Sequence, residues 1–205
     1  KEQITTACII LICLVLYGIF PASGIFQNLM SSFAFLILVP FLYIKIVLKR
    51  SPGDYGFRVG DAKQGILWGA FSLIFALLIL YIVINFTDFV QNYDIPAFAR
   101  KFFLFLLYEL FIMGFFVLLY ESFFRGFVQH SFARKLGIAS VVLQALLFIA
   151  FLALTQNLSW SFFPFVLFSP LSGIIAYRSS SLIYSFASAL LFIIITDTIL
   201  ISLTR

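Results

Sequence analysis

Residues 64–86 read QGILWGAFSLIFALLILYIVINF, a run without a single charged side chain. A helix needs about 20 consecutive apolar residues to cross the hydrocarbon core of a bilayer, so this run predicts one membrane span. Comparable runs recur along the chain, separated by short segments that contain charged residues, glycine or proline. The runs and their breakers predict seven spans, at residues 4–23, 28–48, 64–86, 102–122, 137–155, 160–177 and 181–203. Pro21, Ala22, Ser23 and Gly24 form a predicted break near the far end of the first span.

The composition excludes a water-soluble domain. Of the 205 residues, 63% are hydrophobic and 10% are charged, and the mean hydropathy is +1.15. Soluble domains contain about half apolar and about a quarter charged residues. The runs are apolar on every face, whereas the strands of a barrel would alternate. The sequence therefore predicts an all-α fold, a polytopic transmembrane helical bundle that forms a single domain over residues 1–205. It excludes soluble nucleotide-binding and nucleic-acid-binding classes.

The basic residues are distributed unevenly between the two sides of the predicted bundle. Three of the thirteen, Arg100, Lys101 and Arg205, fall on the C-terminal side, together with Asp88 and Asp94. The other ten fall on the side of the N-terminus: Lys1, Lys45, Lys49, Arg50, Arg58, Lys63, Arg125, Arg134, Lys135 and Arg178. By the positive-inside rule, the N-terminus is predicted to be cytoplasmic and the C-terminus to lie on the opposite side. The net charge of +5 is then a signal of topology and of attraction to anionic lipid, not of a nucleic-acid partner.

Two connections contain more than a turn. Residues 50–63 mix turn formers with spaced charges, which predicts a cytoplasmic anchoring segment that enters the third span at about Gln64. Residues 126–137 place Phe127, Phe132 and Leu136 among polar neighbours and stop at a glycine. That pattern is typical of a short helix lying in the membrane interface.

Ionisable side chains inside the spans are the first candidates for function, because a charge at membrane depth is costly. Glu121 and Arg125 lie four residues apart, so they share one helical face and can neutralise each other. Glu109 has no evident basic partner, so it is expected to be neutral and to hydrogen-bond to Gln144 on the next span. A proton-relay or ligand-binding role is the alternative for Glu109. Asp197, in the outer half of the last span, admits the same two interpretations.

Residues 120–129 read YESFFRGFVQ and are followed by ARKLG at 133–137. These segments resemble the first motif, E-E-x-x-x-R-G, of the CPBP family of intramembrane proteases (CAAX protease and bacteriocin-processing, also called Abi). Residues 178–184, RSSSLIY, are similar to the R-T-G-S-L-W stretch that opens the last catalytic helix of that family. The resemblance is specific over the first motif and loose over the rest of the chain. It implies a CPBP-like fold.

The resemblance also implies which residues would perform hydrolysis. In active members, the first Glu activates a water molecule, the second Glu pairs with the Arg, and histidines from F-x-x-x-H and H-x-x-x-N motifs complete the site. Here Tyr120 replaces the first Glu, and a phenol does not ionise near neutral pH as a carboxyl group does. Glu121 and Arg125 retain the pairing half of the motif, and Thr155 is expected at the first histidine position. The expected counterparts of the second histidine are Ser188 or Ala189, and those of the Asn are Phe192 or Ile193.

The sequence predicts no metal site and no cofactor. His130 is the single histidine of the chain, it follows the first motif, and it is expected to face the surface or the lipid head groups. A zinc site needs three or four convergent ligands. Cys8 and Cys13 lie on different faces of the first span and are expected to be small buried apolar residues without a disulfide.

Taken together, the residues and the resemblance predict a catalytically degenerate CPBP-like membrane protein. It would act as a scaffold, chaperone or regulatory subunit for a membrane-protein partner within the lipid bilayer. One alternative is an active, divergent intramembrane endopeptidase that uses Glu121 as base and Thr155 or Tyr120 as hydrogen-bond donors. The other is a small accessory or transport subunit that uses Glu109 and Asp197. Transport is disfavoured because no broken helix recurs in two halves of the chain.

Overall fold

The computed structural model describes residues 2–20 and 24–204, and all regular structure in that part of the chain is helical. The predicted break at Pro21, Ala22 and Ser23 lies outside the described residues. The elements are α1 (Glu2–Ile19), α2 (Ile25–Phe33), η1 (Ala34–Leu38), α3 (Val39–Leu42), η2 (Tyr43–Val47), η3 (Pro52–Tyr55), α4 (Ala62–Phe86), α5 (Phe89–Asn92), η4 (Ala97–Arg100), α6 (Phe102–Leu107), η5 (Tyr108–Met113), α7 (Gly114–Tyr120), η6 (Glu121–Gln129), α8 (His130–Leu136), α9 (Ala139–Leu154), η7 (Trp160–Phe162), α10 (Phe163–Ser179) and α11 (Leu182–Leu203).

The helices confirm an all-α, multi-pass integral membrane protein. Within the described residues, six helical stretches are long and apolar enough to cross a bilayer: Glu2–Ile19, Phe26–Val47, Ala62–Phe86, Phe102–Leu136, Trp160–Ser179 and Leu182–Leu203. The remaining predicted span, 137–155, forms α9, an apolar helix of 16 residues. At 1.5 Å per residue, α9 is about 24 Å long, somewhat less than the thickness of a typical hydrocarbon core.

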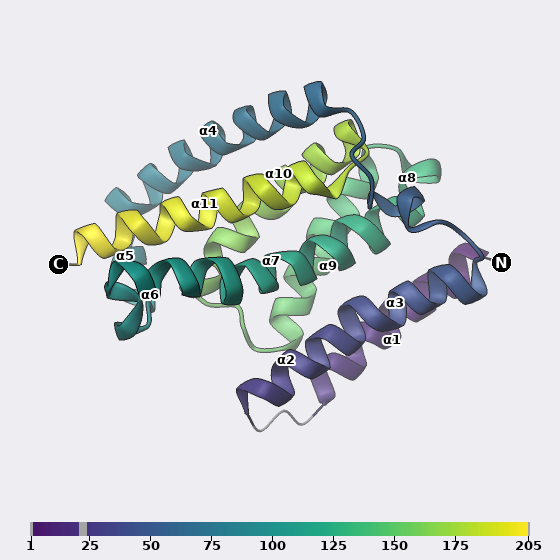
Figure 1. The fold of residues 1–205 in the computed structure, drawn as a ribbon, viewed down its shortest axis with the longest axis horizontal. Coiled ribbons are helices and arrows are strands. Elements are labelled where there is room, and N and C mark those ends of the chain that lie inside the picture. The colour runs from purple at the N-terminus through teal and green to yellow at the C-terminus, as the bar shows by residue number, and fades with distance from the viewer. Residues whose placement is uncertain (1, 21–23, 205) are drawn as a thin grey trace.

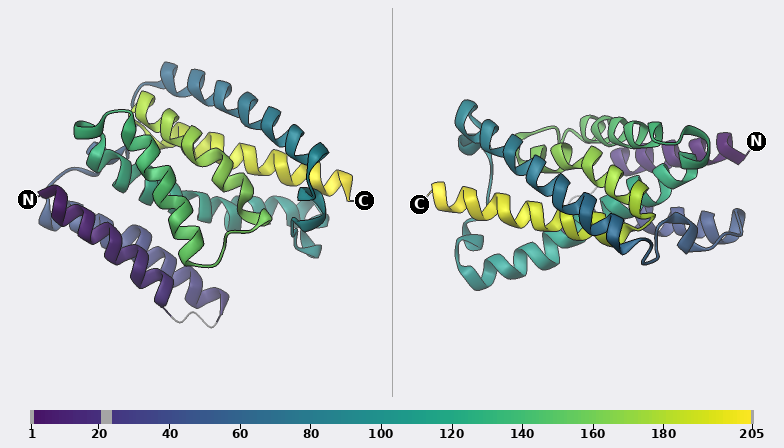
Figure 2. Two further views of the ribbon diagram at one scale, coloured as in Figure 1. Left: turned by 180° about the vertical axis from the view of Figure 1, so that it is seen from behind. Right: turned by 90° about the horizontal axis from the view of Figure 1, so that it is seen from above.

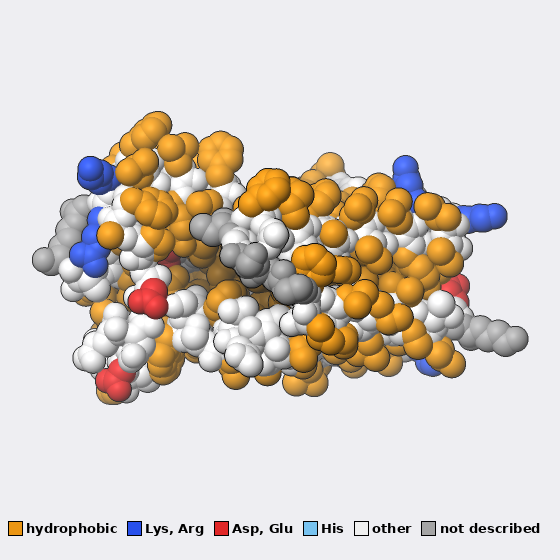
Figure 3. Space-filling view, turned by 90° about the horizontal axis from the view of Figure 1, so that it is seen from below, with side chains coloured by type: hydrophobic (Ala, Val, Ile, Leu, Met, Phe, Trp, Pro, Cys, Tyr) orange, Lys and Arg blue, Asp and Glu red, His pale blue; other side chains and the backbone are white. Residues whose placement is uncertain are grey.

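The two ends of the chain lie at opposite ends of the long axis of the molecule, in all the ribbon views (Figures 1 and 2). The helices α4, α10 and α11 pack against one another. On the other flank, α1 packs against the continuous helical stretch from α2 to η2, here called the α2–α3 arm. The α7–η6 stretch and α9 lie between these two groups. On the face drawn in Figure 3, charged side chains gather toward the two ends and hydrophobic side chains cover the surface between them. That distribution suits a band of lipid around the middle of the bundle.

The segment before α4 is anchored to the turn between α10 and α11, consistent with its predicted anchoring role. The Ser181 hydroxyl donates to the Arg58 carbonyl oxygen at 2.6 Å, and Arg58 Nε donates to the Ser180 carbonyl oxygen at 3.1 Å. Gly60 has a φ of +61°, and a Cβ there would collide with the carbonyl oxygen of Ser179. Asp61 then caps α4 by accepting a hydrogen bond from the Gln64 amide at 3.0 Å.

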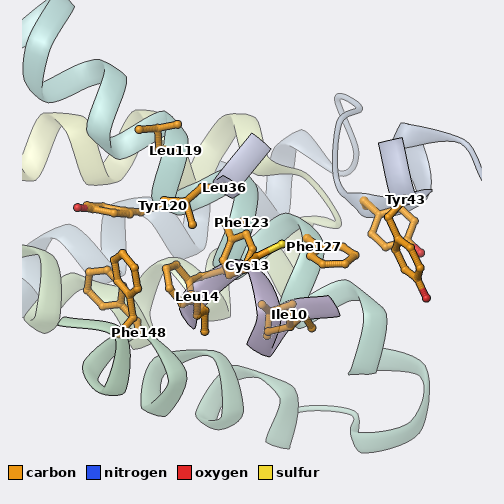
Figure 4. Packing of buried hydrophobic residues seen from close by; sticks show 14 of the residues in the cluster. Ile10, Cys13, Leu14, Leu36, Tyr43, Leu119, Tyr120, Phe123, Phe127 and Phe148 are labelled. Atoms are coloured by element: carbon orange, nitrogen blue, oxygen red, sulfur yellow. The ribbon is translucent and has the colours of Figure 1, made fainter. Parts of the chain in front are cut away.

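Two hydrophobic clusters fill the bundle. The first joins α1, the α2–α3 arm, α7, η6 and α9, and Figure 4 shows side chains of α1 beside the phenylalanines of η6. The second joins α4, α5, η5, α7, α10 and α11. The largest fully buried side chains of the first cluster include Phe123, Phe124, Phe127, Phe148 and Phe151. Phenylalanines therefore supply most of the bulk around α7 and η6, where Tyr120, Glu121 and Arg125 lie.

Two predictions about the surface are wrong. The helix that begins at Phe102 does not end near residue 122 but continues to Leu136, and Gly126 and Phe127 are buried inside the bundle. Only α8, at the end of that run, fits the predicted interfacial helix.

Cys8 is exposed on the outer face of α1, whereas Cys13 is buried as expected, and both thiols are free. The two cysteines differ in exposure because α1 packs against its neighbours on one side only.

Candidate functional site

Glu121 and Arg125 lie in η6, a stretch of nine residues with π-helical hydrogen bonding that continues α7 without a break. All nine residues of η6 are buried. Runs of π-helix are rare, and in other proteins they often occur at functional sites. The wider turn changes how residues four apart stack. It leaves Arg125 Nε 3.5 Å from Glu121 Oε1, a single contact rather than the two-pronged pairing that Arg can make with a carboxylate.

The pair is sealed from solvent. Glu121 and Arg125 are each 3% exposed, and the guanidinium Cζ of Arg125 lies 5.6 Å from the centre of the Phe148 ring. The opposite charges and the ring face together offset part of the cost of burying the two ions. Arg125 Nε and Glu121 Oε2 have no hydrogen-bond partner among the described residues. The pair therefore stabilises itself mainly by charge neutralisation.

The cavity at this pair is very small. It encloses about 10 Å³ and is lined by Val117, Tyr120, Glu121, Arg125, Phe148, Phe165, Phe168, Ser172, Ala189 and Ile193. About one water molecule fits a space of that size, and a buried water needs two to four polar partners. Glu121, Arg125 and the unpartnered hydroxyl group of Ser172 supply three. No peptide group fits in this cavity without movement of the surrounding rings.

Tyr120 belongs to an aromatic cluster rather than to a polar site. It is 5% exposed, and its ring centre lies 5.3 Å from that of Phe148 and 5.6 Å from that of Phe165, both edge to face. Such contacts stabilise packing. Thr155, at the end of α9, donates its hydroxyl to the Phe151 carbonyl oxygen at 3.0 Å and does not line the cavity. The residue of α9 that lines the cavity is Phe148, not Thr155.

Of the four residues expected as counterparts of the last histidine and the Asn, Ala189 and Ile193 line the cavity, and Ser188 and Phe192 do not. Ala189 and Ile193, four residues apart on α11, both line its wall. A His and an Asn at this spacing would face Glu121 from across the bundle, but these side chains carry no polar group. Apart from Tyr120, whose ring packs among other aromatic rings, the polar residues of the wall are Glu121, Arg125 and Ser172.

Sequence reasoning missed a ladder of polar contacts between the helices around the site. Gln129 Nε2 donates to the Gly173 carbonyl oxygen at 2.8 Å, and Gln144 Nε2 donates to the Ser169 carbonyl oxygen at 3.0 Å. Both glutamines are fully buried. The prediction that Gln144 hydrogen-bonds to Glu109 is wrong, because the Gln144 side chain donates to α10 instead. A sequence signal did exist: Gly173 lies inside an apolar span, where close helix approach favours small residues.

Gly173→Ala is expected to destabilise the protein. A Cβ there would lie 2.6 Å from Gln144 Nε2 and 2.9 Å from Val141 Cγ1, so these buried side chains or the helix α9 that carries them must shift. Overpacking of this kind costs about 1–3 kcal/mol. The matched control is Gly114→Ala in α7, where the nearest atom lies at 3.4 Å and the substitution should be neutral or stabilising. Unfolding by SDS in mixed micelles measures both variants, and equal stability of Gly173→Ala and wild type would contradict the prediction.

A second buried polar group lies in the half of the bundle nearer the C-terminus. Glu109 in η5 and Asp197 in α11 are 0% and 2% exposed, and their side chains interact. The Tyr93 hydroxyl, from the loop after α5, donates to Asp197 Oδ1 at 2.6 Å. Burial and then the Asp197 carboxyl raise the pKa of Tyr93 above its ordinary value, so its phenol stays a donor. The sequence indicated both acids but not that they meet, nor that Tyr93 joins them.

His130, predicted to face the surface or the lipid head groups, is partly buried at the start of α8. Its ring is half-buried beside Gly56, and Nδ1 lies 2.6 Å from the Arg125 carbonyl oxygen, to which it donates. Within residues 2–20 and 24–204, no group of three or more His, Cys, Asp or Glu side chains is placed to hold a metal ion.

No protein-family model, no curated protein and no solved structure matches this chain. Family and function are therefore inferred from the residues of the site and their geometry.

Proposed function

We propose that this chain is a catalytically inactive, CPBP-like membrane protein that acts by contact with another membrane protein. The observation that carries the proposal is the Glu121–Arg125 pair, which is retained inside a cavity of about 10 Å³ that no imidazole lines. The two ions neutralise each other within one helix, Arg125 lies over the Phe148 ring of α9, and packing residues surround the pair where a hydrolytic site would need proton carriers. Charge asymmetry supports a cytoplasmic N-terminus.

Hydrolysis of a peptide needs space for the substrate as well as a base. A general base must lie within hydrogen-bond reach of the proton that it removes. In the small cavity that Glu121 shares with Arg125, that space is occupied by Phe148, Phe165 and Phe168, and only 3% of Glu121 is exposed in any direction. The divergent endopeptidase is accordingly the weaker candidate, since Thr155 does not line the cavity and Tyr120 is packed among rings.

A larger pocket lies beside the same glutamate and suits a contact function. It has a volume of about 420 Å³ and is lined by Gly56, Phe57, Arg58, Val59, Leu118, Glu121, Ser122, Leu182, Ile183 and Phe186. Phe57, Val59 and Ile183 are 46%, 64% and 49% exposed, so the pocket opens outward. Phe57 and Val59 lie outside the candidate spans, where exposed apolar surface is typical of interaction sites. The partner we propose is an apolar segment of another membrane protein, which would lie against the anchoring segment and the start of α11.

Site-specific photo-crosslinking in the native membrane tests the contact function. A photoreactive residue in place of Ile183, in the pocket, is expected to form one discrete protein adduct that mass spectrometry identifies. The control position is Leu146 on α9, which is 61% exposed and lies outside the pocket. Adducts with lipid alone at both positions, or the same scattered proteins at both, would contradict a specific partner at the pocket.

A further inference from the structure

Glu109 and Asp197 are two acidic side chains from different spans that interact inside the bundle. Neither an opposite charge nor solvent stabilises this interaction. They come from η5 and α11, they are almost fully buried, and their carboxyl groups interact with each other. Even so, neither oxygen of Glu109 receives a hydrogen bond from any donor among the described residues. Two ionised carboxylates are both acceptors, so they can form a hydrogen bond only when one of them carries a proton.

Within residues 2–20 and 24–204, no basic side chain interacts with this pair; the exposed Arg100 of η4 lines a surface pocket with Thr198, the residue after Asp197. Among the described residues, the other ionisable groups that interact with it are Tyr93, from the loop after α5, and Tyr108, at the start of η5. The helices α4 and α10, which pack against α11, contribute apolar residues of the second hydrophobic cluster there. Their charged side chains, Lys63 and Arg178, lie at the opposite ends of those helices, next to the anchoring segment.

The hydrogen-bond partners of the two carboxyl groups indicate which of them carries the proton. Asp197 Oδ1 already accepts the Tyr93 hydroxyl at 2.6 Å, which favours a negative charge on Asp197. Glu109 has no such donor, so its carboxyl is the one that carries the hydrogen. Two like charges in contact inside a membrane would be far costlier than one.

We propose that Glu109, Asp197 and Tyr93 form a buried site that binds one proton between the two carboxyl groups. The proton fastens the Phe102–Leu136 helix to α11 and to the loop at Tyr93. When the proton leaves, two carboxylates face each other, and these elements lose their mutual attraction. With this proton bound, the folded protein holds one proton more than the unfolded chain near neutral pH. Its stability therefore falls as the pH rises and the proton is lost. This site is separate from the Glu121–Arg125 cavity, and the proposal does not depend on the contact function.

Two measurements on the purified protein in lipid nanodiscs test the site. Infrared spectroscopy at neutral pH is expected to show the carbonyl band of a protonated carboxylic acid, which disappears in Glu109→Gln. Thermal unfolding of the wild type is expected to shift to lower temperature as the pH rises from mildly acidic to alkaline. Glu109→Gln keeps a neutral hydrogen-bond donor beside Asp197, so its unfolding midpoint should lose that pH dependence. The matched control is Asp88→Asn, which changes an exposed acid of the loop before α5 and should leave both readouts as in the wild type.

The opposite results would overturn the proposal. A wild type without a carboxylic acid band at neutral pH, or a Glu109→Gln variant with unchanged pH dependence, would show that no proton is held there. Stabilisation at alkaline pH by sodium but not by choline would assign the site to a metal cation instead. Should Glu109→Gln fail to fold, the wild type still decides the matter, since its band must titrate away over the same pH range in which its stability falls.

Discussion

Arg125→Ala is expected to destabilise the folded protein by about 3–5 kcal/mol, the cost of leaving one buried ion without its partner. Arg125 is 3% exposed, and its guanidinium is the cation that neutralises Glu121. Without it, the carboxyl group either remains charged in an apolar wall or takes up a proton, and both outcomes cost free energy. Loss of the contact with the Phe148 ring adds to the effect. SDS unfolding in mixed micelles and the yield of folded protein measure it.

A double variant separates structural pairing from chemistry. Glu121→Leu combined with Arg125→Met replaces both ions with apolar side chains of similar volume, an exchange that is often neutral in buried pairs. We expect the double variant to recover most of the stability that Arg125→Ala loses. The matched control is Arg134→Ala, since Arg134 is an exposed arginine of α8 and its loss should change stability little. A double variant as unstable as the single one would contradict a role confined to pairing.

Phe124→Ala is the second large effect, with an expected loss of up to about 3 kcal/mol, the lower end of the range for such truncations in soluble cores. Phe124 is 0% exposed, and its ring centre lies 5.0 Å from that of Phe123 and 5.1 Å from that of Phe148. Because lipid tails are as apolar as the core, the cost arises from lost packing contacts and the cavity rather than from transfer out of water. The same unfolding assay gives the magnitude.

The control for Phe124→Ala is Phe111→Ala on the same helical run. Phe111 is 71% exposed, on the outer surface, so its truncation removes contacts with lipid and not with the core. We expect a change within about 0.5 kcal/mol for Phe111→Ala. Equal losses for the two variants would show that the aromatic cluster around Tyr120 does not stabilise the bundle.

The sequence was sufficient for the fold class because apolar runs about 20 residues long have few structural alternatives in a membrane. The predicted third span, 64–86, differs by two residues from α4, which begins at Ala62 behind the Asp61 cap. The pairing of Glu121 with Arg125 was also predictable, because helical spacing places both on one face. Those are local relations, set by neighbours along a single helix.

The parts that could not be predicted depend on contacts between distant elements. The spacing of Glu109 and Asp197 in the sequence says nothing of their meeting across two spans, nor of Tyr93 reaching them from a loop. Similarly, the continuation of the helix past residue 122 is set by burial of η6 against α9 and α11, which keeps Gly126 inside. The polarity of residues 126–137 alone indicated an interfacial helix, and tertiary packing overrode it.

The most direct test is a cleavage assay with the purified protein in liposomes, supplied with membrane-embedded and lipid-linked peptides and read by mass spectrometry. If the small cavity around Glu121 leaves no room for hydrolysis, wild type and Glu121→Gln liposomes should yield the same products as liposomes without protein. Peptide cleavage by the wild type that disappears in a folded Glu121→Gln variant would contradict the account, because Glu121 would then be a working base rather than half of a structural pair.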